Sequence, residues 1–248
     1  MDSLLLALNL AVLLGALLQA ASGIGFGVIA GPMILIALND GSAIQVTSIL
    51  SLLIAVVLLP SVLRHVERAI LRRFLIGSLA GLPLGLAAFI WFPVAALKLL
   101  AGFSILLLCL MLLRRRASGF LAQPGPGLDH ATGVVSGAMS VGLAMPGPVA
   151  AVRLAALTYP KEATRATILL LFVFSYSVAI AAQAAANGLS GETLRLSLGL
   201  VPATLIGIGL GALLSRRLSE RWFHRVILAI LLATAASLLL SASGVSLG

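Results

Sequence analysis

Two glycine- and proline-rich segments, each inside a long apolar run, carry the residues best suited to binding a small ligand. The first spans residues 19–32 and contains Gly23, Gly25, Gly27 and Gly31, with a proline at its end. Glycines at this spacing weaken a helix. Where a helix unwinds inside a membrane, the first amides of the next half-helix attract an anion. The pattern therefore predicts a broken helix that binds an anion.

The second segment, residues 136–148, is interrupted more sharply. Pro146 and Pro148 flank Gly147, and prolines remove backbone donors and disfavour continuation of the preceding helix. Paired interruptions at matching places in two halves of a membrane protein point to a site between them. The alternative is that both sets of glycines only allow neighbouring helices to approach closely, as small residues commonly do in membranes.

Arg153 is a charge inside an apolar run. Such a charge is costly unless it faces a cavity or a partner. Thr158 follows about five residues later, roughly 7 to 8 Å of helix rise, so the side chain reaches either a bound anion or the membrane interface. Lys161 and Arg165 lie just beyond, and they either concentrate anions in a vestibule or are ordinary cytoplasmic loop residues.

The candidate ligand-binding residues are the glycines and prolines of the two segments, neighbouring hydroxyl and amide side chains, and two arginines. They are Gln19, Ser22, Gly23, Gly25, Gly27, Gly31, Thr47, Ser136, Gly137, Ser140, Gly142, Pro146, Gly147, Arg153, Arg165 and Thr167. Any of the hydroxyls has the alternative of bonding to its own helix backbone.

Catalytic and metal chemistry finds little support. The carboxylates fall outside the middle of every apolar span, and the three histidines fall in loops or at segment ends without the spacing of metal ligands. Phosphate-loop motifs do not occur either. We therefore expect no cofactor, no bound metal and no enzyme activity.

Composition places these residues in a membrane. Of 248 residues, 61% are hydrophobic and 9% are charged, against roughly 25% charged in a soluble domain. The apolar runs exceed the roughly ten-residue strands of membrane barrels and suit helices of about 20 residues. The formal charge of +9 then indicates basic cytoplasmic loops rather than a nucleic-acid partner.

The apolar runs fall into two similar halves. Residues 3–39 and 131–157 are each long enough for two short helices, and the single spans are 42–60, 74–92, 94–113, 166–187, 196–215 and 226–240. Five segments per half make the second half inverted relative to the first. We predict a first repeat at 1–113, a cytoplasmic linker at 114–130 and a second repeat at 131–248, with every basic residue except Lys98, Arg153 and Arg195 on the cytoplasmic side.

The landmarks that recur between the halves resemble the sulfite exporter family TauE/SafE, also described as toluene sulfonate uptake permeases. They are the two Gly-rich segments, the stretches 43–47 and 163–167, and the glycine pairs Gly81/Gly85 and Gly207/Gly211. The resemblance implies export or uptake of small sulfur-containing anions such as sulfite or sulfonates.

The sequence thus predicts an all-α, polytopic protein of the cell (inner) membrane, with two inverted repeats and broken or re-entrant helices. The predicted function is that of a secondary transporter that exports a small sulfur-containing anion by alternating access, either down a gradient or coupled to another ion. The candidate partners are the anion, the lipid bilayer, a coupling ion such as a proton, and further copies of the chain in a homo-oligomer. Replacing Arg153 with Gln is expected to abolish transport. The alternatives are a membrane-embedded assembly subunit without transport activity and an intramembrane enzyme.

Overall fold

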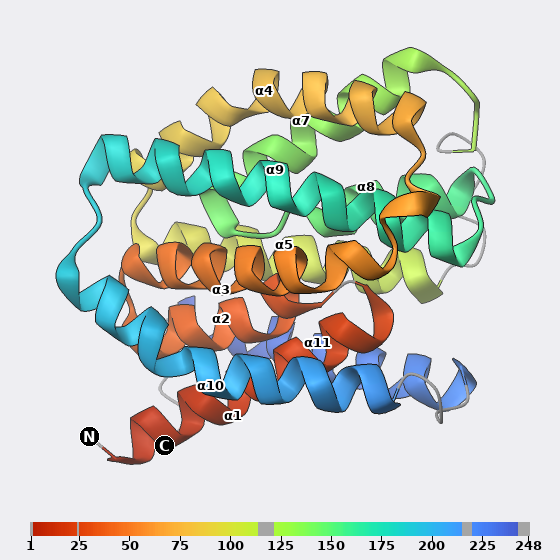
Figure 1. Cartoon of the computed structure of the whole chain (residues 1–248). Coiled ribbons are helices and arrows are strands. Elements are labelled where there is room, and N and C mark those ends of the chain that lie inside the picture. Colours follow the sequence, from red (N-terminus) through yellow and green to blue (C-terminus); the bar gives the residue numbers. More distant parts are fainter. Residues whose placement is uncertain (1, 24, 114–121, 215–219, 243–248) are drawn as a thin grey trace.

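The structure is a computed structural model that describes residues 2–23, 25–113, 122–214 and 220–242 (Figure 1). The regular elements in these ranges are all helical. In chain order they are α1 (Asp2–Ser22), α2 (Phe26–Leu38), α3 (Ser42–Leu58), η1 (Leu59–Ser61), η2 (Leu63–His65), α4 (Arg68–Trp91), α5 (Val94–Leu113), α7 (Pro126–Leu143), α8 (Gly147–Ala156), α9 (Lys161–Asn187), α10 (Gly191–Leu214) and α11 (Glu220–Ala242).

The apolar runs form membrane-spanning helices. Within the described ranges, α1, α3, α4, α9 and α10 are long and apolar enough to cross a membrane. Large apolar side chains face outward, and Leu84, Phe103 and Leu198 are 62%, 61% and 69% exposed. Exposure of such an apolar surface to water is unfavourable, whereas its contact with lipid tails is not. The prediction of an all-α polytopic membrane protein is confirmed.

Both of the longest apolar stretches divide into two helices, as predicted. The first break is confined to residues 23–25, where Gly23 and Gly25 have φ of 85° and 148°. Glycine adopts these angles without the steric penalty of a side chain. The second break lies between α7 and α8, where Ala144 is left-handed with φ of 54°. Residues 126–130, expected in the linker, form the first turn of α7.

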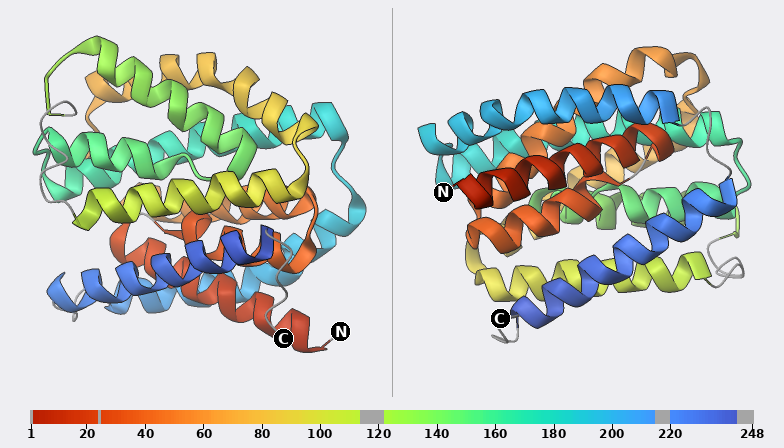
Figure 2. Two further views of the ribbon diagram at one scale, coloured as in Figure 1. Left: turned by 180° about the vertical axis from the view of Figure 1, so that it is seen from behind. Right: turned by 90° about the horizontal axis from the view of Figure 1, so that it is seen from below.

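The helices form one bundle in which pairings recur between the two halves (Figures 1 and 2). α4 packs along α7, and α10 packs along α1; likewise α3 contacts α10, and α9 contacts α4. α5 and α11 pack against each other on one face, which Figure 2 shows from behind. When α1–α5 are matched in order with α7–α11, the α4–α7 pair corresponds to the α10–α1 pair, and the α3–α10 pair corresponds to the α9–α4 pair. The α5–α11 pair corresponds to itself.

Glycines bring the paired helices into backbone contact. A Cβ added at Gly81 of α4 would lie 2.0 Å from the carbonyl oxygen of Val134 on α7. A Cβ at Gly211 of α10 would lie 2.2 Å from the carbonyl oxygen of Leu17 on α1. Both glycine pairs that mark the halves in the sequence therefore serve close helix packing.

The basic side chains of α4 and α9 gather at one end of the bundle, which we call the basic end. Arg73 of α4 bonds to α7 there, and the backbone N–H of Glu67 donates to Thr167 of α9 at 3.0 Å. The opposite end, the far end, holds Lys98, which is 5% exposed and donates to Asn39 Oδ1 at 2.7 Å.

Candidate functional site

The two helix breaks meet inside the bundle. Gly27, in the first turn of α2, faces the second break, and a Cβ added there would lie 2.3 Å from the carbonyl oxygen of Ala144. One turn later, a Cβ at Gly31 would lie 3.1 Å from Thr47 Cγ2 and 4.0 Å from Met145 Cε. The N-termini of the half-helices α2 and α8 therefore lie close together, and each leaves first-turn amides without intrahelical acceptors.

Gln19 caps the start of α2. Its Oε1 accepts a hydrogen bond from the Phe26 backbone N–H at 2.9 Å, and its side chain is 1% exposed. Because the carbonyl oxygen of the side-chain amide must face this N–H, the orientation of the amide is determined. Its Nε2 is buried and has no hydrogen-bond partner among the described residues.

Arg165 brings a positive charge from α9 to the same break. Its Nη2 donates to the carbonyl oxygen of Ala20 at 2.8 Å, near the C-terminus of α1. A Cβ at Gly23 would lie 2.8 Å from Arg165 Cγ, so the absence of a side chain at position 23 leaves room for the arginine. The buried Nε atom has no partner within the described part of the chain.

The backbone carbonyls at the second break are tied to α9. Tyr176 Oη donates to the carbonyl oxygen of Ala144 at 3.1 Å, and Gln183 Nε2 donates to that of Val141 at 2.7 Å. These bonds satisfy acceptors that the end of α7 leaves open. The Oε1 of Gln183 is buried and unpaired among the described residues.

Two serines of α7 also stabilise this region. Ser136 Oγ donates to the carbonyl oxygen of Pro146, and Ser140 Oγ donates to that of Ser175 at 3.1 Å. The hydroxyls of Ser175 and of Ser48 on α3 are buried, and neither has a partner in the described ranges. Polar groups therefore surround the breaks.

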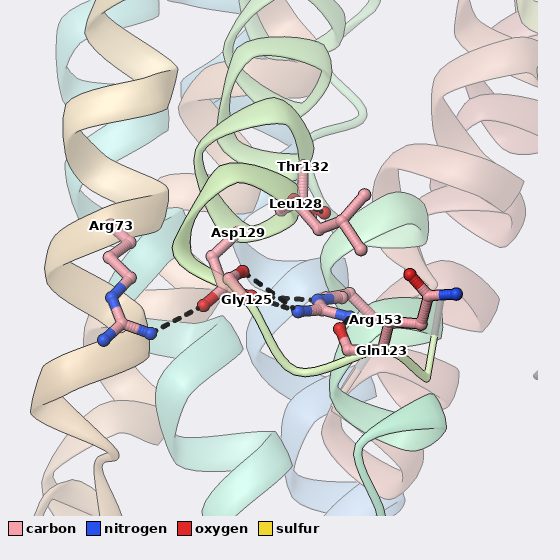
Figure 3. Close-up of polar contacts among 7 residues, drawn as sticks. All are labelled: Arg73, Gln123, Gly125, Leu128, Asp129, Thr132 and Arg153. Carbon is pink, nitrogen blue, oxygen red and sulfur yellow. Dashed lines mark hydrogen bonds and ion pairs between the residues drawn. The ribbon is translucent and has the colours of Figure 1, made fainter. Parts of the chain in front are cut away.

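Arg153 has a different setting, shown in Figure 3. Its Nε and Nη2 donate to Asp129 Oδ1 at 2.9 and 2.7 Å, and its Nη1 donates to the carbonyl oxygen of Gln123 at 2.9 Å. Arg73 Nη1 donates to Asp129 Oδ2 at 2.9 Å. Arg153 is 1% exposed, so its side chain is enclosed by the protein. Its charge is balanced by a carboxylate.

Asp129 was not among the predicted site residues, because the sequence pattern placed it in the linker. The sequence does contain a signal for the start of a helix just before Asp129, since Gly125 and Pro126 precede it and proline favours the first helical position. An acidic residue in the first turn of a helix is also stabilised by the helix dipole.

Two of the predicted ligand residues, Gly137 and Gly142, lie in the contact between α7 and α4. A Cβ at Gly137 would lie 2.2 Å from the carbonyl oxygen of Ser78, and one at Gly142 would lie 3.3 Å from that of Gly85. Both glycines therefore face α4, where small residues permit the close α4–α7 packing.

Two predicted hydroxyl ligands already have structural partners. Thr47 Oγ1 donates to Ala43 of its own helix at 2.7 Å, and Thr167 Oγ1 accepts the Glu67 N–H. The side chain of Ser22 lies outside the described residues. The remaining candidates gather at the two breaks: Gln19, Gly23, Gly25, Gly27, Gly31, Ser136, Ser140, Pro146, Gly147 and Arg165.

These features define a multi-pass, all-helical membrane protein with two broken helices that meet at its centre. Residues 8–238 match the family model of the sulfite exporter TauE/SafE, and the chain belongs to this family. The resemblance noted in the sequence is thus confirmed, and membership in a transporter family indicates a transport protein rather than an enzyme. Comparisons with curated proteins and with solved structures give no match.

Proposed function

We propose that the protein is a secondary transporter that exports a small sulfur-containing anion, sulfite or an organosulfonate, across the cell (inner) membrane. The observation that carries the proposal is the meeting of the two half-helices, where α2 starts against the α7–α8 break through Gly27 and Ala144. A helix N-terminus carries about half a positive charge, and opposed half-helices are a recurrent substrate site in secondary transporters.

The charges of the described residues favour an anion over a cation at this place. Asp129, the buried carboxylate of these residues, is paired with Arg73 and Arg153. It lies in the first turn of α7, whereas the break follows the last residue, Leu143, about 21 Å away by helix rise. Arg165, by contrast, bonds to the end of α1 beside the first break.

The matched helix pairings support alternating access by two repeats, whose helices are α1–α5 and α7–α11. α1 with α10 repeats α7 with α4. Each of these two pairs takes one helix from each repeat. Rocking of one repeat against the other exposes the site to either side in turn. Basic residues collect on the cytoplasmic side of membrane proteins, so we assign the basic end to the cytoplasm.

The test is transport by the purified, full-length protein in liposomes. Vesicles loaded with sulfite, methanesulfonate or chloride are diluted into anion-free buffer, with and without a pH gradient, and empty liposomes serve as the control. We expect release of sulfite or methanesulfonate above the control rate, and an effect of the pH gradient if protons are the coupling ion. If the protein releases none of the anions, the proposal fails and an assembly role becomes the better explanation.

A further inference from the structure

We propose that the anion binds at the α1–α2 break rather than equally between both breaks, with the side-chain amide of Gln19 and the guanidinium of Arg165 as its ligands. The inference rests on the proposed function and specifies which atoms hold the substrate. The ligand class is a sulfur oxyanion that presents several acceptor oxygens.

The side-chain amide of Gln19 has an unsatisfied donor. Its oxygen is held by the Phe26 N–H at 2.9 Å, so its Nε2 is left as a pure donor beside the α1–α2 break. The residue is 1% exposed, and this donor finds no acceptor among the described residues. Buried donors without acceptors are rare in folded proteins and call for an explanation such as a ligand.

The neighbouring unsatisfied groups are donors as well. Arg165 Nε is buried and unpaired among the described residues, although Nη2 of the same side chain is anchored on Ala20. The amides of Gly27 and Val28 follow Phe26 in the first turn of α2, where a helix supplies no acceptor. A group of donors with a net positive charge requires a ligand that is negatively charged and rich in lone pairs.

The second break has a different character. The unsatisfied side-chain atoms of α9 there, within the described residues, are the acceptor Oε1 of Gln183 and the hydroxyl of Ser175, which can donate or accept. Pro148, at the second position of α8, has no N–H to offer. An oxyanion bound at the second break would face the lone pairs of Gln183 Oε1 and fewer hydrogen-bond donors than at the α1–α2 break. The two breaks are therefore not equivalent, although they occupy matching positions in the two repeats.

Arg153 does not supply the missing charge at the second break. Two of its nitrogens donate to Asp129 and a third to the carbonyl oxygen of Gln123. Arg165 is thus the arginine placed to balance a bound anion. Sulfite and a sulfonate head group share an SO3 face with three acceptor oxygens and negative charge, and both satisfy several donors at once.

The test is binding of sulfite and methanesulfonate to the full-length protein in lipid nanodiscs, measured by calorimetry in oxygen-free buffer. In Gln19→Glu one carboxylate oxygen still accepts from Phe26, while the other replaces the donor and repels the anion. We expect at least about tenfold weaker binding. Arg165→Gln removes charge from α9 and is expected to have an effect of similar size.

Gln45→Glu is the matched control. It makes the same chemical change on α3, where Gln45 Nε2 donates to the carbonyl oxygen of Gly188 at 2.9 Å, at the far end. We expect binding within about twofold of the wild type. If Gln19→Glu does not fold, as judged by circular dichroism, Gln19→Met keeps the side-chain volume and removes the donor, and weaker binding is again expected.

The outcomes separate the two proposals. Wild-type binding that survives Gln19 and Arg165 substitutions unchanged overturns this inference and leaves the transporter proposal standing. A wild-type protein that neither binds nor moves any of the anions overturns both. Sulfite binding without methanesulfonate binding identifies the inorganic ion, and the reverse identifies a sulfonate, each with the same ligand atoms.

Discussion

Removing Asp129 is expected to destabilise the protein more than removing Arg153, although the two side chains share one ion pair. In Asp129→Asn, the guanidinium of Arg153 stays 1% exposed and loses its carboxylate partner, while it keeps the neutral carbonyl oxygen of Gln123. In Arg153→Met, the Asp129 carboxylate keeps Arg73 at 2.9 Å. The charge left behind is therefore compensated in the second variant and uncompensated in the first.

The magnitudes follow from burial. Breaking a buried pair by removing one partner costs about 3–5 kcal/mol, and we expect Asp129→Asn to fall in this range. Arg153→Met should cost about 1–3 kcal/mol, because Arg73 still neutralises Asp129. The side chain of Arg73 is 37% exposed, so Arg73→Met should cost less than about 1 kcal/mol.

Equilibrium unfolding of the purified protein in mild detergent, followed by far-UV circular dichroism, measures these differences. The double variant Asp129→Asn/Arg153→Met completes a double-mutant cycle, and it should be destabilised by about 0.5–3 kcal/mol less than the sum of the single variants. Destabilisation by Asp129→Asn that is no larger than that by Arg153→Met, or simple additivity of the two effects, would contradict a buried ion pair in which Arg73 compensates Asp129.

Three further predictions concern packing, the second break and topology. Gly81→Ala places a Cβ 2.0 Å from a carbonyl oxygen of α7 and should lower the free energy of unfolding by about 1–3 kcal/mol; Gly199→Ala, with no neighbour within 4 Å, should not lower it. Tyr176→Phe removes the donor to a buried carbonyl and should cost about 1–3 kcal/mol in the same unfolding assay. In a cysteine-free background, Arg68→Cys should be labelled by an impermeant reagent from the cytoplasmic side and Gly188→Cys from the other; labelling of both from one side would contradict the assigned topology.

The helix breaks could be predicted from the sequence because they depend on local chemistry. Glycine and proline disfavour a helix wherever they occur in it, and both long apolar stretches divide where these residues cluster. The residues at which the helices begin and end could be predicted less well from the sequence. Helices α4 and α9 begin in the charged flanks, at Arg68 and Lys161, because a helix continues past the apolar span into the interface.

Contacts between distant residues could not be read from the pattern. Arg153 and Asp129 are 24 positions apart, and they meet because α8 folds back along α7 toward the basic end. The apolar run around Arg153 gives no indication of this carboxylate. The interpretation of Arg153 as an interface or anion-binding residue therefore considered only its own helix.

The same limit applies to the glycines. Gly27 and Gly137 occur in similar Gly-rich segments, but Gly27 faces the second break and Gly137 faces the backbone of α4. Which face of a helix meets a site depends on the neighbouring helices, and the order of residues does not fix it. The proposed role of Gln19 likewise depends on the orientation that the Phe26 N–H imposes on its amide.

Locating the anion is the most direct test of the central claim. Selenite carries the same pyramidal oxyanion as sulfite, and its selenium atom is visible by anomalous scattering in crystals of the full-length protein. We expect an anomalous peak at the α1–α2 break, within hydrogen-bond distance of Gln19 Nε2 and Arg165. A peak beside Arg153 or at the α7–α8 break, with none at Gln19, would contradict it.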